Sequence, residues 1–140
     1  MIPAVCIDRE GEVSISDSEI KGNEVKETIG ILSRLGVLEI KNSLISGHKE
    51  GGIIVWGNRE NGTTIIKNKI EKNLFGVSIM GDEFSPKISQ NQITENICGV
   101  KIGLSSEADV SRNYICENSS GIEVYSSFPV IYLNKIDKNK

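Results

Sequence analysis

One pattern of apolar, asparagine and glycine residues is repeated three times between residues 62 and 118. Each copy reads apolar-x-x-Asn-x-Ile-x-x-Asn, and three residues further on it continues as Gly-apolar-x-apolar. The copies begin at Ile65, Ile88 and Val110, which gives a period of about 22 residues. A period of this length indicates a repeat architecture.

The same pattern extends in both directions with small changes in spacing. Earlier copies cover 15–23 and 37–47, and a last copy covers 130–139 without its Gly-apolar-x-apolar segment. The apolar column is Ile20, Leu44, Ile70, Ile93, Ile115 and Ile136. The first Asn column is Ser18, Asn42, Asn68, Asn91, Asn113 and Asn134, and the second is Asn23, Gly47, Asn73, Asn96, Asn118 and Asn139. Residues 1–12 are interpreted as an N-terminal partial coil or cap, and 13–140 as one repeat domain or a segment of a longer solenoid.

Apolar residues alternate with other residues inside each copy, as at Val77 and Ile79. This period of two predicts β-strands. Short strands with near-identical neighbours one period away can stack in parallel, with a rise of about 4.8 Å for each coil. We therefore predict an all-β, single-stranded parallel β-helix of five to six coils. A leucine-rich repeat is disfavoured because its Leu-x-x-Leu-x-Leu frame is missing.

The asparagine and glycine columns are predicted to shape each coil. Asparagine tolerates the left-handed backbone region and bonds to neighbouring backbone groups, so a stacked column can form an amide ladder at a corner. The residues assigned to this ladder are Asn42, Asn68, Asn91, Asn113 and Asn134. A positive φ is expected at the glycine that opens each long strand, namely Gly52, Gly76, Gly99 and Gly121.

The phrases at 51–57 (Gly-Gly-Ile-Ile-Val-Trp-Gly), 75–79 and 85–88, together with Asn-x-Ile-x-x-Asn, resemble the right-handed parallel β-helix repeats of pectate-lyase-like proteins. They are most similar to the carbohydrate-binding-and-sugar-hydrolase (CASH) β-helix of F-box-only proteins, over about 13–139. The resemblance implies a right-handed coil and a substrate-recognition role in a ubiquitin-ligase-type protein, although no F-box is visible. Lyases, hydrolases and binding scaffolds share this fold, so the resemblance alone does not choose between them.

Composition narrows the possible functions of the 140-residue chain. Its net charge is −3 and its lysines are scattered, so a nucleic-acid partner is not expected. No apolar run reaches the length of a membrane helix, and no secretory signal is recognised, so no membrane partner is expected. The three cysteines, Cys6, Cys98 and Cys116, form no close pairs, which favours a reducing, cytoplasmic location.

The long strands present two outward columns in which catalytic residues would lie. Alternation predicts that Leu32, Ile54, Ser78, Lys101 and Glu123 form one column, and Arg34, Trp56, Met80, Gly103 and Tyr125 the next. Lys101 and Glu123 are expected to form a cross-strand ion pair, and no two acids are neighbours on this face. No catalytic residue, metal site or cofactor is therefore assigned, and the function is expected to be non-enzymatic.

Two further polar features lie outside the columns. The loop acids are interpreted as solvated, with Ca²⁺ binding as the alternative; they are Glu60, Asp82, Glu83, Glu107 and Asp109. The one histidine, His48, is expected to be a surface residue in an extended turn.

The strongest functional signal is an apolar one. Trp56, Met80 and Tyr125 are predicted to lie outward along one face, and exposed apolar stripes mark binding surfaces. The candidate binding residues are Trp56, Met80, Tyr125, Ile54, Lys101 and Glu123. A protein or peptide is the first expected partner and carbohydrate the second, the alternative function being a carbohydrate-binding or polysaccharide lyase- or hydrolase-like domain. A purely structural solenoid and end-to-end self-association through uncapped coils are further hypotheses.

Overall fold

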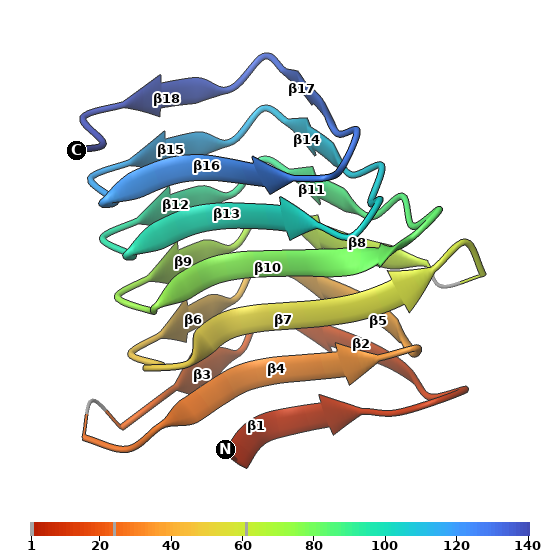
Figure 1. Ribbon diagram of the computed structural model, residues 1–140. Helices are drawn as coiled ribbons and strands as arrows, with labels where there is room; N and C mark the ends of the chain where they lie inside the picture. The colour runs from red at the N-terminus through yellow and green to blue at the C-terminus, as the bar shows by residue number, and fades with distance from the viewer. Residues whose placement is uncertain (1, 24, 61) are drawn as a thin grey trace.

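The computed structural model describes residues 2–23, 25–60 and 62–140, and these residues form three six-stranded parallel sheets (Figure 1). Sheet A contains the long strands β1 Ile2–Ile7, β4 Thr28–Arg34, β7 Gly51–Asn58, β10 Phe75–Asp82, β13 Cys98–Gly103 and β16 Ser120–Tyr125. Sheet B contains β2 Glu12–Ser16, β5 Val37–Lys41, β8 Thr63–Ile66, β11 Lys87–Ser89, β14 Asp109–Ser111 and β17 Val130–Tyr132. Sheet C contains β3 Glu19–Lys21, β6 Leu44–Ser46, β9 Lys69–Glu71, β12 Gln92–Thr94, β15 Tyr114–Cys116 and β18 Lys135–Asp137.

The chain visits sheets A, B and C in turn, so each coil contributes one strand to each sheet. The long strands of sheet A form one face of the molecule, and sheets B and C lie behind them (Figure 1). This arrangement confirms the predicted all-β parallel solenoid of about six coils. None of the described segments forms a helix with the length and apolarity of a transmembrane span.

Columns of aliphatic side chains fill the space between the sheets. In sheet C, Ile45, Ile70, Ile93 and Ile115 are direct neighbours in the parallel register, and all are fully buried. Burying each such side chain stabilises the fold by about 1.5–3 kcal/mol. Core packing therefore accounts for the recurrence of isoleucine in the repeat, and no functional role is needed to explain it.

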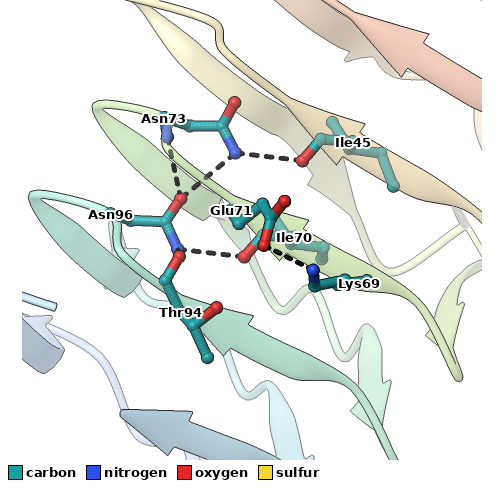
Figure 2. A network of polar contacts seen from close by, with 7 residues as sticks. All are labelled: Ile45, Lys69, Ile70, Glu71, Asn73, Thr94 and Asn96. Atoms are coloured by element: carbon teal, nitrogen blue, oxygen red, sulfur yellow. Dashed lines mark hydrogen bonds and ion pairs between the residues drawn. The ribbon is translucent and has the colours of Figure 1, made fainter. Parts of the chain in front are cut away.

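Two ladders of asparagine side chains run along the corners of the coils. One consists of Asn68, Asn91, Asn113 and Asn134, and the other of Asn73, Asn96, Asn118 and Asn139. Figure 2 shows one rung, in which Asn73 donates from its backbone N and its Nδ2 to Asn96 Oδ1, at 3.0 and 3.1 Å. Asn96 Nδ2 donates in turn to the carbonyl of Ile70 in the coil before it, at 3.1 Å. Each rung thus satisfies buried backbone groups that the turn leaves outside the sheets.

The assignment of Asn42 to the first ladder was wrong by one residue. Ser43 occupies the ladder position, because its backbone N donates to Asn68 Oδ1 at 3.0 Å. Asn42 is the preceding residue and has a φ of 50°. A positive φ is likewise found just before the rungs at Asn68, Asn91 and Asn113, so the left-handed residue and the ladder residue are two adjacent positions.

Two further positions of the second repeat shift by one residue in the same way. Ile45, not Leu44, pairs with Ile70 in the sheet register. His48, not Gly47, stands next to Asn73 in the second ladder.

The prediction that His48 is a surface residue was also wrong. Its side chain is 1% exposed, and its backbone N donates to Asn73 Oδ1 at 3.0 Å. Its ring Nε2 lies 3.1 Å from the carbonyl oxygen of Ile20, where it replaces an asparagine amide. Because a carbonyl only accepts, Nε2 carries the proton, and Nδ1 accepts from the Thr28 hydroxyl at 3.1 Å.

The glycines that open the long strands do not have the positive φ that was expected of them. Among the described glycines, only Gly47 and Gly81 have one. A Cβ atom on Gly76 would instead lie 2.6 Å from the carbonyl oxygen of Gly99. A Cβ on Gly99 would meet Gly121 at the same distance. Close approach of successive coils is therefore what requires glycine here.

Candidate functional site

The outer face of sheet A carries the candidate binding residues. The strand register places Arg34, Trp56, Met80, Gly103 and Tyr125 side by side, one from each successive strand. Trp56 is 52% exposed and Tyr125 is 53% exposed, so neither ring faces the core. Met80 between them is half-buried. The alternation along the strands is therefore as predicted.

Two adjoining hollows run across this column of residues. The larger, of about 490 Å³, is lined by Asp8, Arg9, Arg34, Leu35, Trp56, Gly57, Met80, Gly81 and Leu104. The smaller, of about 270 Å³, is lined by Met80, Lys101, Gly103, Leu104, Tyr125 and Ser126. They share Met80 and Leu104 in their linings, so they adjoin one another, and we call the two hollows together the sheet A groove.

A missing side chain deepens the middle of the sheet A groove. Gly103 lies between Met80 and Tyr125 in the register. A Cβ atom on Gly103 would meet only the carbonyl oxygen of Tyr125, at 3.7 Å, which is ordinary contact. The position therefore has room for a methyl group. The absence of a side chain at Gly103 leaves this space as part of the groove.

Charged residues lie near both ends of the sheet A groove. At one end Arg34 Nη2 donates to Asp8 Oδ2 at 3.0 Å, with both side chains at least half exposed. At the other end the ammonium of Lys101 lies 4.8 Å from the centre of the Phe75 ring and 5.4 Å from that of Tyr125. Cation–π attraction holds the Lys101 side chain against these two rings.

The predicted ion pair between Lys101 and Glu123 is not formed, although the two residues are neighbours in the register. Glu123 instead accepts hydrogen bonds from Ser120 Oγ at 2.5 Å and from the Tyr125 hydroxyl at 2.8 Å. These two bonds, that of Ser120 first, lower the pKa of the Glu123 carboxyl. The bond to Glu123 raises the pKa of the Tyr125 hydroxyl. Glu123 is therefore an ionised acceptor at neutral pH.

The buried thiol of Cys98 lies beside this cluster. Burial raises its pKa, which keeps the sulfur protonated at neutral pH. A protonated, enclosed thiol is a poor nucleophile. Cys98 and Cys116 are both free and buried, and Cys6 is free and exposed.

Ile54 is half-buried on the outer face, and its side chain lies over Gly51, outside the linings of both hollows. Ser78, its neighbour on β10, is buried. Of the six candidate binding residues, the sheet A groove thus brings together Trp56, Met80, Lys101 and Tyr125. Glu123 does not line the groove, but it accepts a hydrogen bond from Tyr125, which does.

Two parts of the groove wall are not apparent from the repeat pattern, namely Leu104 and the Asp8–Arg34 pair. Leu104 is 64% exposed and follows β13 directly, inside an otherwise polar turn. An isolated leucine in such a turn was a usable signal. The Asp8–Arg34 contact joins residues 26 positions apart and follows only from the register of β1 on β4.

The loop acids do not gather around a common point. Within 2–23, 25–60 and 62–140, no group of three or more His, Cys, Asp or Glu side chains is placed to hold a metal ion. Glu83 pairs with Arg59 of the neighbouring loop at 3.3 Å.

The three stacked parallel sheets and their internal ladders define a β-solenoid with an open groove on one face. The family model described as "Right handed beta helix region" matches residues 3–140. The chain therefore belongs to the right-handed β-helix family. Neither the curated proteins nor the solved structures compared with it gave a match. The family assignment fits a scaffold or binding role and does not define a subfamily.

Proposed function

We propose that the chain is a non-enzymatic binding module that holds an extended segment of a partner protein in the sheet A groove. The observation that carries this proposal is the pair of adjoining hollows that share Met80 and Leu104, one lined by the exposed ring of Trp56 and the other by that of Tyr125. Exposed tryptophan and tyrosine side chains are the usual anchors of protein interfaces. Burying them against a partner removes apolar surface from water, which favours association.

The length of the groove suits a short extended peptide. Arg34 and Tyr125 are separated by four strand spacings in the register. At about 4.8 Å for each spacing, this distance is about 19 Å, which about six residues of extended peptide would cover. The room at Gly103 fits one side chain of such a peptide.

The charged residues near the groove are suited to orienting a bound peptide and not to catalysing a reaction. The Asp8–Arg34 pair stands at one end and Lys101 with Glu123 near the other, so polar groups of a peptide meet both signs of charge. The lowered pKa of Glu123 and the raised pKa of Cys98 make these groups a poor proton donor and a poor nucleophile at neutral pH. Both pKa shifts therefore favour a binding role over a catalytic one.

A combinatorial library of seven-residue peptides, panned against the folded chain, tests this proposal. Peptides with apolar residues should be enriched, and Trp56→Ala should weaken their binding by tenfold or more, as expected for an aromatic anchor. Val25→Ala, which truncates an exposed apolar residue outside the groove, is the matched control and should bind like the parent. Equal enrichment on the parent and on Trp56→Ala would remove the sheet A groove as the site and leave a purely structural solenoid as the better explanation.

Carbohydrate binding is the second candidate function, favoured by the same two exposed rings. Sugar rings stack on aromatic faces, and Trp56 and Tyr125 flank an open groove. A glycan array read with the parent, Trp56→Ala and Val25→Ala separates this candidate from the first. A glycan signal that Trp56→Ala abolishes would favour it over peptide binding.

The finer proposal, recognition of ubiquitination substrates, rests on the resemblance to F-box-only proteins alone. Co-purification of the chain with ubiquitin-ligase subunits in both the parent and Trp56→Ala, together with ubiquitinated proteins that only the parent retains, would support it. If the chain binds peptides but does not co-purify with ligase subunits, the proposal of a binding module stands and that of a ligase role is rejected.

A further inference from the structure

The side chains that line the sheet A groove are net basic, although the chain as a whole is acidic. The charged residues of the lining are Asp8, Arg9, Arg34 and Lys101. Three of them are basic and one is acidic, which gives the lining a net charge of +2 in a chain whose net charge is −3. A concave surface lined mainly by one sign of charge attracts ligands of the opposite sign, here anions.

The ammonium group of Lys101 is available to such an anion. In the part of the chain that the structure describes, Lys101 forms no ion pair, and it lies instead against two aromatic rings, which do not neutralise its charge. Glu123 is its neighbour in the register, but the two carboxylate oxygens of Glu123 accept hydrogen bonds from Ser120 and Tyr125. Lys101 is also half-buried, so its charge is screened less than that of a fully exposed lysine.

Two guanidinium groups stand at the other end of the groove. Arg9 forms no ion pair with any residue that the structure describes. Arg34 uses Nη2 for its bond to Asp8, and because a guanidinium has five N–H donors, Arg34 can bind a second carboxylate beside that of Asp8. Both side chains of this pair are at least half exposed, and such pairs contribute little to stability, so a ligand can share Arg34 without a large loss.

The spacing of the two positive ends matches an extended peptide. Arg34 on β4 and Lys101 on β13 are separated by three strand spacings, with β7 and β10 between them. At about 4.8 Å for each spacing, this separation along the solenoid is about 14 Å, which roughly four residues of extended chain cover. Residues four apart in an extended chain point to the same side, as does the residue midway between them. That middle residue lies over β7 and β10, where Trp56 and Met80 form an apolar wall with Leu104.

From these charges and this spacing we infer that the segment held in the sheet A groove is an acidic peptide, with two carboxylate side chains about four residues apart and an apolar side chain midway between them. One carboxylate is bound by Arg34 and Arg9, and the other enters the space at Gly103 and is bound by Lys101. The inference rests on the proposed peptide-binding function and adds to it the chemical class of the peptide.

Fluorescence anisotropy with labelled seven-residue peptides tests the inference. The probe is Gly-Glu-Ser-Leu-Ser-Glu-Gly, which is compared with the same peptide carrying glutamine, or lysine, in place of both glutamates. A third comparison peptide, Gly-Glu-Glu-Leu-Ser-Ser-Gly, has the composition of the probe with its two acids adjacent. The parent chain should bind the probe about tenfold or more tightly than each of the three. Its preference over the glutamine peptide should decrease as NaCl is added, because salt screens exposed charges.

Two variants of the chain each remove one positive end of the groove. Lys101→Gln and Arg34→Gln should each weaken binding of the probe by about fivefold or more and leave binding of the glutamine peptide unchanged, because only the probe carries carboxylates. Lys87→Gln makes the same change of charge on an exposed residue of β11, outside both hollows, and should bind the probe like the parent. Circular dichroism establishes that each variant is folded.

The possible failures of the inference and of the proposed function are distinguishable. Equal affinity for the acidic and glutamine peptides, with both lost in Trp56→Ala, would overturn the inference and leave the proposed function intact. If no peptide of any charge binds in a manner that Trp56→Ala abolishes, the proposed function fails and the inference fails with it. Binding of alginate, an anionic polysaccharide, that Lys101→Gln and Arg34→Gln abolish, without binding of the probe, would overturn the inference in favour of a carbohydrate ligand.

Discussion

The backbone amide of His48 donates to Asn73 Oδ1 at 3.0 Å, which makes a histidine one rung of an asparagine ladder. The imidazole is enclosed, and burial lowers its pKa, although its bond to the Ile20 carbonyl acts in the opposite direction. This rung is the described ladder position that titrates near neutrality. Stability should therefore depend on pH through a residue that has no part in the groove.

The first prediction concerns His48→Asn. Above the unfolded pKa of about 6.5, histidine is neutral in both states and its contribution to stability is complete. As the pH falls below this value, the unfolded state binds the proton more readily, so the free energy of unfolding decreases until the lowered folded pKa is reached. His48→Asn should lose this part of the acid sensitivity.

Urea denaturation of parent and variant across this pH range gives the difference between their unfolding free energies. Carboxylates common to both proteins largely cancel in that difference. Two profiles that run parallel below the unfolded pKa would contradict the prediction.

The second prediction concerns the ladder rung at Asn96. Asn96→Ala removes the acceptor of the Asn73 backbone amide and the donor to the Ile70 carbonyl, both of which are buried. Buried groups without partners cost about 1–3 kcal/mol each, so a loss of about 3 kcal/mol in unfolding free energy is expected. Gln92→Ala, on an exposed position of the same coil, should change it by less than about 0.5 kcal/mol. Chemical denaturation measures both, and similar effects would speak against a structural ladder.

The third prediction contrasts two glycines of sheet A. Gly76→Ala should destabilise the fold by about 2 kcal/mol or more, because its Cβ would lie 2.6 Å from the Gly99 carbonyl oxygen. Gly103→Ala should leave the melting temperature nearly unchanged, because its Cβ meets nothing closer than 3.7 Å. The added methyl group at Gly103 should nevertheless weaken peptide binding, since it occupies the floor of the sheet A groove. Unchanged affinity in Gly103→Ala would place the ligand elsewhere.

The fourth prediction concerns Tyr125→Phe. The change removes one of the two hydrogen bonds that lower the pKa of Glu123. The pKa of this carboxyl should rise, although Ser120 keeps it below its ordinary value. An NMR titration of the Glu123 side chain follows the shift, with Ser120→Ala as the companion variant that should raise the pKa further. No change in either variant would contradict the described hydrogen bonds.

Periodicity alone was enough to predict the solenoid, because stacked isoleucines and asparagines must recur once in every coil. The register of Trp56 on Met80 could be predicted as well, since Gly52 and Gly76 stand four residues before them in their strands. The second repeat was misplaced by one residue because asparagine suits both the left-handed position and the ladder. Asn42 occupies the first of these and Ser43 the second.

The shape of the candidate site was less accessible from the sequence. The outward direction of Trp56 and Tyr125 follows from alternation, but the hollow between them depends on how the turn at Leu104 folds over the strands. The aromatic contacts of Lys101 depend on Phe75, two strands away from Tyr125 in the register. Such contacts between coils are set by side-chain packing, which the repeat pattern does not encode.

The presence of one rung of each ladder in every inner coil has a consequence for how such a molecule can change in length. Duplication of residues 88–109 would insert one complete coil, with an asparagine for each ladder and an isoleucine or valine for each core column. The binding face would lengthen by one strand while the rest of the stack kept its register. Insertions of other lengths within the strands would misalign both ladders, so gene duplication in whole periods is the route by which this architecture can acquire longer ligands.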